Sequence, residues 1–156
     1  MDVATGEFVG ELRWGIKSGF RRYVAELPDG SISATDGAYS LDDGRYAFPV
    51  VRIRSIDPVV IEFGGTVRFE GHGGLLRVQI AQLEVQIDGD SFAIDAAGTP
   101  DHPRITIARG TGPVFNSAGS PVSPRLAPEG VALFDGNYAV GTELDAVELL
   151  LGAAVS

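Results

Sequence analysis

Short runs of β-branched and aromatic residues, interrupted by glycine and proline, predict an antiparallel β fold for this chain. Its 156 residues include 21 glycines and 9 prolines, which separate runs such as VVRIRSI, VVIEF, SFAIDA and RITIAR. Such residues pack well on a pleated surface, whereas glycine and proline end strands in turns. The pattern predicts a mainly β, antiparallel β-sandwich-like domain. A chain of this length buries one core, so residues 1–156 are expected to form a single domain.

The alternation of apolar and polar residues also predicts where one strand breaks. In the run LLRVQIAQLEVQI, apolar residues occupy even numbers from Leu76 to Ile80 and odd numbers from Leu83 to Ile87. Successive side chains of a strand point to opposite faces, so this change of parity predicts a bulge or break near Ala81–Gln82. The stretch 110–130 is rich in glycine, proline and serine and is typical of a long loop.

The opening segment LRWGIKSGFRRYV differs from the rest of the chain. Leu12, Ile16, Phe20 and Val24 recur every four residues, which is the spacing of one apolar helical stripe. This spacing predicts the first of one or two short helices at residues 12–24.

Two glycines follow the same spacing beside that stripe. Gly15, Gly19 and Tyr23 would form the neighbouring ridge of the predicted helix. Each glycine costs about 0.8–1 kcal/mol relative to alanine inside a helix, so a bare ridge needs a reason. One interpretation is close packing of the helix on a sheet. The other is a flat ligand that lies on the ridge and meets the Tyr23 hydroxyl.

The composition excludes several classes of function. The chain has 21 acidic and 12 basic residues and a net charge of −9, which argues against nucleic acid or an anionic membrane as the main partner. It has no cysteine, so disulfides, zinc–thiolate sites and thiol catalysis are excluded. The N-terminal residues lack the pattern of a signal peptide, and VELLLGAAVS is shorter than the roughly 20 residues of a membrane helix.

Motifs for catalysis and metal binding are weak. The two histidines, His72 in FEGHGG and His102 in TPDHPR, lack the spacing of a zinc site, and the sequence has no GxSxG elbow or P-loop. His72 follows an alternating strand and lies between glycines that leave its imidazole uncrowded. His102 is bracketed by prolines, as in a solvated turn. These residues do not predict an enzyme.

Several segments, in order, resemble one family. WGIKSGFRRYV, DGAYS, YAFP, GTVRFEGHGGLLRVQIAQLEVQI and NYAVGTELDAV are together similar to the HtaA domain. This domain is the haem-binding module of iron-acquisition systems in certain Gram-positive cell envelopes. The most specific pieces are W-G-x-K-x-x-F-R-x-Y, F-x-G-H-G-G and Y-x-x-G-T-E-L-D, and their order at compatible distances makes the resemblance specific.

The resemblance implies a cofactor and its ligand. The family has an all-β sandwich-like fold with short helices and binds ferric haem through a tyrosine of its first helix, which a histidine at a strand end supports. Carried over by motif, Tyr23 is the axial ligand of the haem iron and His72 forms a hydrogen bond to it. The Tyr23 hydroxyl is therefore expected within ~3–4 Å of a His72 ring nitrogen, or one bridging water away.

The resemblance also assigns further residues to the haem site and shows two departures. Gly19 stands where the family often has a serine that bonds a haem propionate, although Ser18 is adjacent. Asn137 precedes Tyr138 where the family usually has an aromatic residue that packs on the porphyrin. Phe20 either lines the pocket or belongs to the core. These departures predict weaker haem affinity than in a typical member.

Two functions follow from this reading. The first is a non-catalytic haem-binding module that captures ferric haem and passes it to another haem-relay protein. The second is a β-sandwich module that recognises a protein or glycan and has lost haem binding. The resemblance implies a secreted or cell-surface location, whereas the chain itself shows no signal peptide, membrane segment or basic patch for nucleic acid.

Overall fold

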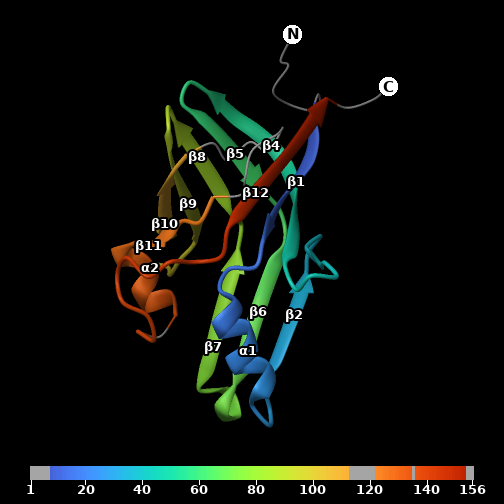
Figure 1. Cartoon of the computed structure of the whole chain (residues 1–156), viewed down its shortest axis with the longest axis vertical. Coiled ribbons are helices and arrows are strands. Elements are labelled where there is room, and N and C mark those ends of the chain that lie inside the picture. The colour runs from blue at the N-terminus through green and yellow to red at the C-terminus, as the bar shows by residue number, and fades with distance from the viewer. Residues whose placement is uncertain (1–7, 113–121, 135, 154–156) are drawn as a thin grey trace.

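The computed structural model describes residues 8–112, 122–134 and 136–153, and it is built mainly of antiparallel strands (Figure 1). The prediction of a mainly β, sandwich-like fold is confirmed. The strands are β1 (Phe8–Trp14), β2 (Ser31–Thr35), β3 (Tyr39–Ser40), β4 (Tyr46–Ile56), β5 (Val59–Phe63), β6 (Thr66–Gly71), β7 (Leu76–Ala81), β8 (Glu84–Asp88), β9 (Ser91–Ala97), β10 (Arg104–Thr111), β11 (Arg125–Leu126) and β12 (Val147–Ala153). The helices are α1 (Ser18–Glu26) and α2 (Pro128–Leu133), and a 3₁₀ turn covers His72–Gly74.

Within the described residues the strands form two sheets. The large sheet has the order β11-β10-β9-β8-β5-β4-β1-β12, with β3 paired to β4, and the small sheet has the order β2-β6-β7. Helix α1 packs on the small sheet in the lower half of Figure 1, and α2 lies beside β10. The small sheet and α1 together carry the residues discussed below.

The predicted break near Ala81–Gln82 is confirmed, and it separates the two sheets. Strand β7 ends at Ala81, Gln82 has a φ of 53°, and β8 begins at Glu84. The neighbouring connection, between β5 and β6, contains a similar break at Gly65, whose φ is 104°. A residue with a left-handed conformation cannot continue a β ladder. The two breaks therefore separate β5 and β8, in the large sheet, from β6 and β7, in the small sheet.

The predicted first helix at residues 12–24 is wrong in its first half. Residues up to Trp14 belong to β1, where Leu12 lies opposite both Phe48 and Leu149, and the helix begins only at Ser18. Ile16, between the two elements, has a φ of 68°, which no helix residue adopts. The four residues of the predicted stripe are all buried. Their spacing therefore predicted burial correctly but predicted the wrong secondary structure for residues 12–17.

The predicted loop over 110–130 is also partly wrong. Residues 113–121 lie outside the described residues. Within the rest, Arg125–Leu126 form β11, which pairs with β10, and α2 begins at Pro128. Proline at the first position of a helix costs no hydrogen bond, so this composition suits a short helix as well as a loop.

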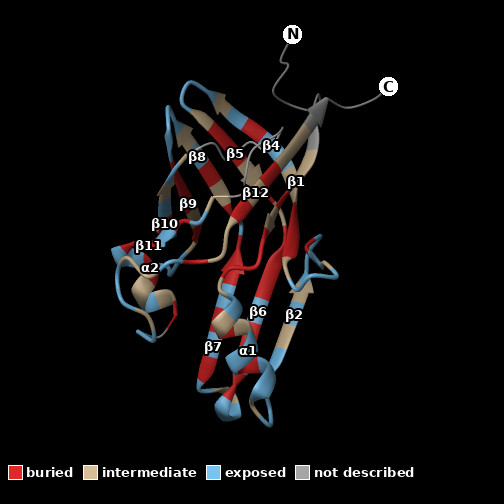
Figure 2. Cartoon of the chain, viewed as in Figure 1, coloured by how far each residue is buried: buried red, intermediate tan, exposed pale blue. Residues whose placement is uncertain are grey.

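Aromatic side chains from the helices and the small sheet meet in the core. The Phe20 ring contacts the rings of Phe69 and Phe134 edge-on, at centroid distances of 4.9 and 5.4 Å. All three side chains are buried, and Figure 2 shows buried residues along β6 and β7 behind α1. These contacts fix α1 on the small sheet because edge-to-face aromatic pairs constrain both distance and orientation.

Candidate functional site

Tyr23 and His72 meet at the surface, next to the small sheet. Tyr23 is on α1 and His72 is in the turn after β6, 49 residues away, and the Tyr23 hydroxyl lies 2.5 Å from His72 Nε2. The expected proximity of the two side chains is therefore confirmed. Tyr23 is 44% exposed and His72 is also exposed. The phenol and imidazole thus form a hydrogen-bonded pair that a molecule in solution can reach.

The backbone of the His72 turn has an unusual conformation. His72, Gly73 and Gly74 have φ values of 51°, 65° and 92°, all in the left-handed region that favours glycine. The Asp29 carboxylate accepts hydrogen bonds from the backbone N–H groups of His72 (3.1 Å) and Gly73 (2.6 Å). The N–H groups of Gly73 and then His72 hold the pKa of the Asp29 carboxyl below its ordinary value, so the carboxylate is ionised at neutral pH.

Helix α1 is held at its N-terminus by a residue from the other end of the chain. Lys17, which precedes the helix, makes no side-chain cap. Asp145 supplies one instead, because its carboxylate accepts a hydrogen bond from the Ser18 N–H (2.8 Å) and pairs with Arg21 Nη1 (2.5 Å). Its backbone carbonyl accepts a hydrogen bond from Trp14 Nε1 at 2.8 Å. Asp145 therefore orients the helix that presents Tyr23.

Sequence reasoning missed the role of Asp145. The residue stands in the motif Y-x-x-G-T-E-L-D, and its partners stand in the motif W-G-x-K-x-x-F-R-x-Y, 124–131 residues earlier. Nothing in the spacing within either motif signals this contact. Only the presence of both motifs in one chain could have indicated that Asp145 contacts the first helix.

The two glycines of the predicted ridge have different surroundings. Gly15 lies before the helix and is buried, and a Cβ there would collide with Arg21 Nη1 and Asp145 Oδ2. A glycine is needed at position 15 because the Arg21–Asp145 ion pair lies directly against it. For Gly15, neither packing on a sheet nor a flat ligand is the reason. Gly19 is in α1, and a Cβ there would have no atom within 4 Å. The space beside Gly19 is open, which excludes close packing on the sheet as its reason.

These surroundings predict opposite effects of the same substitution. Gly19→Ala is expected to raise the free energy of unfolding by roughly 0.5 kcal/mol, because alanine loses less backbone entropy in a helix. Gly15→Ala is expected to lower it by about 1–2 kcal/mol, because the added methyl displaces the ion pair. Urea denaturation of both variants measures the two effects. Equal effects in both variants would contradict the assignment.

Aromatic residues flank the Tyr23–His72 pair on the side of α2. The Tyr138 ring lies 6.1 Å from the Phe20 ring and 5.9 Å from the Phe134 ring, and the Lys17 ammonium lies 5.7 Å from its centroid. Burial, followed by the nearby Tyr23 phenol, raises the pKa of Tyr138. The Tyr23 ring also lies beside Phe20, at a centroid distance of 6.5 Å, so the two tyrosines share Phe20 as a neighbour.

The other predicted site residues are placed as follows. Phe20 is 1% exposed and belongs to the core. Ser18 is exposed at the first position of α1, and its backbone N–H is bonded to Asp145. The Asn137 side chain donates to the Phe134 carbonyl at 2.8 Å, so it closes the turn after α2. The structure brings Tyr23, His72 and Tyr138 to one region, with the open space of Gly19 on the same helix as Tyr23.

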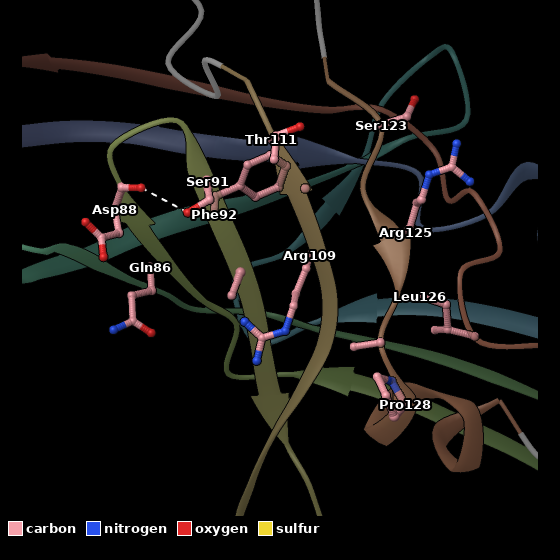
Figure 3. Close-up of a pocket in the computed structure, with 13 residues that line it drawn as sticks. Gln86, Asp88, Ser91, Phe92, Arg109, Thr111, Ser123, Arg125, Leu126 and Pro128 are labelled. Carbon is pink, nitrogen blue, oxygen red and sulfur yellow. Dashed lines mark hydrogen bonds between the residues drawn. The ribbon is translucent and has the colours of Figure 1, made fainter.

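A cavity of about 720 Å³ lies elsewhere, over β8 to β11 (Figure 3). Arg109 and Arg125 face each other there in the ladder between β10 and β11, and the Arg125 guanidinium donates to the Gly141 carbonyl. Its lining includes no histidine, tyrosine or methionine. These side chains and cysteine are the axial ligands of haem iron in proteins, so the described lining of this cavity offers no such ligand.

The fold and the site define a class of protein: a domain of two antiparallel sheets whose N-terminal helix presents an exposed tyrosine to a histidine of a strand turn. The chain belongs to the HtaA family, whose model matches residues 9–150. The resemblance found in the sequence is confirmed. No curated protein gives a significant match.

Solved structures similar to this chain include three from Corynebacterium glutamicum. The C-terminal domain of HtaA is similar with a TM-score of 0.79 at 23% identity, over 96% of this chain and 97% of that domain. The N-terminal domain of HtaA gives a TM-score of 0.70 at 24% identity, over 95% and 97% of the two chains. The heme binding protein HtaB gives 0.69 at 18% identity, over 95% and 94%. These similarities confirm the fold.

Proposed function

We propose that this protein binds ferric haem, with Tyr23 as the axial ligand of the iron and His72 as the hydrogen-bonding partner of the tyrosine oxygen. The observation that carries the proposal is the 2.5 Å contact between the Tyr23 hydroxyl and His72 Nε2 on an accessible surface. Membership of the HtaA family and the similarity to a protein described as heme binding support it.

The chemistry of the pair suits this role. A free tyrosine has a pKa near 10, so its phenolate must be stabilised at neutral pH. Bound ferric iron supplies most of that stabilisation as a positive charge on the oxygen. His72 contributes by donating a hydrogen bond from Nε2, which also fixes the direction of the phenol ring. An anionic oxygen ligand favours Fe(III) over Fe(II), which suits capture and transfer and not oxygen chemistry.

The surroundings of Tyr23 fit a large flat group. The side of α1 at Gly19 is open, and the aromatic ring of Tyr138 lies on the α2 side. Two large apolar side chains that are close in sequence to His72 and Tyr138 are exposed: Leu75 (86%), three residues after His72, and Val140 (59%), two residues after Tyr138. Apolar surface at an accessible site is expected where a porphyrin is bound.

Exposure of the proposed ligand also supports transfer to another protein. Tyr23 is 44% exposed, so an acceptor protein can approach the surface at which the haem would bind. We infer that the module is non-catalytic, passes haem to a second haem-relay protein, and acts at the cell surface or after secretion. Among the described residues, no helix is both long and apolar enough to cross a bilayer.

Titration of the wild-type chain with hemin tests the proposal. The expected result is a shifted Soret band at one hemin per chain, with a high-spin ferric spectrum and a phenolate-to-iron charge-transfer band. Absence of any Soret shift would contradict haem binding and favour the alternative, a module that recognises a protein or glycan. Peroxide turnover by the loaded protein is expected to stay at the rate of free hemin, and a faster rate would indicate an enzyme.

A further inference from the structure

We propose that Asp29 is a positioning residue of the haem site, which holds His72 beside Tyr23 by tying the turn after α1 to the turn after β6. The inference rests on the proposed function. The Asp29 carboxylate forms its hydrogen bonds to this region with the backbone N–H groups of His72 and Gly73. Its role is therefore distinct from that of the ligand or its hydrogen-bond partner.

On one side, Asp29 is firmly connected to Tyr23. The helix ends at Glu26, and the following turn is closed by hydrogen bonds from Leu27 N–H to the Val24 carbonyl and from Gly30 N–H to the Leu27 carbonyl, both 3.1 Å. Val24 is fully buried. Because no flexible segment separates α1 from this turn, the position of Asp29 follows that of Tyr23.

On the other side, Asp29 binds a turn whose backbone conformation is unfavourable for a residue with a side chain. Three consecutive residues from His72 to Gly74 are left-handed, and His72 is the one that has a Cβ. Such a conformation persists only where the surroundings determine it. The carboxylate receives two adjacent N–H groups of this turn, at 3.1 and 2.6 Å. Charge-assisted bonds of this kind are the stronger class of hydrogen bond.

A close contact beside Asp29 shows that the two turns are packed together. A Cβ on Gly71 would lie 2.6 Å from Leu27 Cδ1, and Gly71 is buried. The glycine therefore allows the turn after α1 to approach the end of β6 closely enough for the carboxylate to reach. Without the carboxylate, the turn would keep only its internal hydrogen bond from the Leu75 N–H to the His72 carbonyl (3.1 Å), and the imidazole is expected to spend less time next to the phenol.

Asp29→Ala and Asp29→Asn test this role, with Asp43→Ala as the matched control. Asp43 is also an exposed turn carboxylate, and it accepts a backbone hydrogen bond from Arg45 at 3.0 Å and pairs with its side chain. In the haem-free protein, NMR is expected to show amide exchange of His72 and Gly73 about tenfold faster in Asp29→Ala. The cross-peak between the Tyr23 and His72 rings is expected to weaken. Asp43→Ala should change neither, and Asp29→Asn, which keeps one acceptor oxygen, should be intermediate.

Hemin binding tests the connection to function through a double-mutant cycle. Asp29→Ala is expected to weaken hemin binding roughly tenfold and to shift the charge-transfer band, as loss of an outer-shell partner does. In a His72→Ala background the same change should have almost no further effect, because Asp29 acts through His72.

Three results would overturn the inference. These are an unchanged ring cross-peak in Asp29→Ala, unchanged hemin affinity in a wild-type background, or an equal loss of affinity in the His72→Ala background. Failure of the proposed function gives a different result, since the wild-type chain then gives no Soret shift. In that case Asp29 has no role in haem binding. Amide exchange and the cross-peak between the Tyr23 and His72 rings would still show whether Asp29 orders the turn.

Discussion

Replacing Tyr23 with phenylalanine is expected to abolish the phenolate-to-iron charge-transfer band and to weaken hemin binding by more than about 100-fold. Loss of an outer-shell partner costs roughly 10–100-fold in affinity, and loss of the proposed iron ligand itself is expected to cost more. Phenylalanine keeps the ring and its contacts, so the change removes one oxygen and little else. Absorption spectroscopy during hemin titration measures both quantities.

Tyr39→Phe provides a matched control for this experiment. Tyr39 is 48% exposed, close to the 44% of Tyr23, and its hydroxyl also forms a hydrogen bond, to Glu11 Oε1 at 2.5 Å. The control therefore removes an equivalent hydroxyl away from the proposed site, and its hemin affinity should match the wild type. His72→Ala is expected to lose roughly tenfold and to keep a weaker charge-transfer band. Hemin affinity of Tyr23→Phe within threefold of the wild type would contradict the assignment of the ligand.

Asp145→Ala is expected to lower the free energy of unfolding by about 3 kcal/mol. The change removes the cap of α1, which is typically worth about 1 kcal/mol, and leaves the Arg21 guanidinium without its carboxylate, which costs about 2 kcal/mol more. The Arg21 and Asp145 side chains are only 19% and 22% exposed, so water replaces the lost contacts poorly. Urea denaturation followed by circular dichroism measures the effect.

The neighbouring Glu143→Ala is the control for Asp145→Ala. Glu143 is 63% exposed, and its one carboxylate contact among the described residues is a 3.9 Å pairing with Arg125. Exposed pairs of this kind contribute about 0–1 kcal/mol, so the stability of Glu143→Ala should change by no more than about 0.5 kcal/mol. A loss below 1 kcal/mol in Asp145→Ala would show that α1 does not depend on this cap.

The features that the sequence predicted correctly depend on neighbouring residues. Strand alternation and turn residues placed β5 to β10, and the parity change located the break at Gln82. The Tyr23–His72 contact was predicted only through the family motifs, because 49 residues separate the two side chains. Composition and spacing alone left two interpretations open for Tyr23, packing on a sheet or contact with a flat ligand, and did not connect it to His72.

The features that the sequence predicted incorrectly depend on distant pairing. Residues 12–14 have the spacing of a helix, but in the folded chain they lie between β4 and β12. The hydrogen bonds and buried side chains of two neighbouring strands outweigh a local helical preference, which is worth a few tenths of a kcal/mol per residue. Strand β12 was missed for the same reason, because a short apolar run does not show whether a partner exists.

By itself, the sequence determined a mainly antiparallel β fold without disulfides, the break at Gln82, and the motifs that define its family. Only the tertiary structure decided where α1 begins, why Gly15 is small and Gly19 is open, and how Tyr23 and His72 are held. Asp145 reaches Ser18 across 127 residues, and Asp29 reaches His72 across 43. Local preferences act over a few residues, whereas these contacts form only when the sheets bring distant segments together, so no spacing along the chain could specify them.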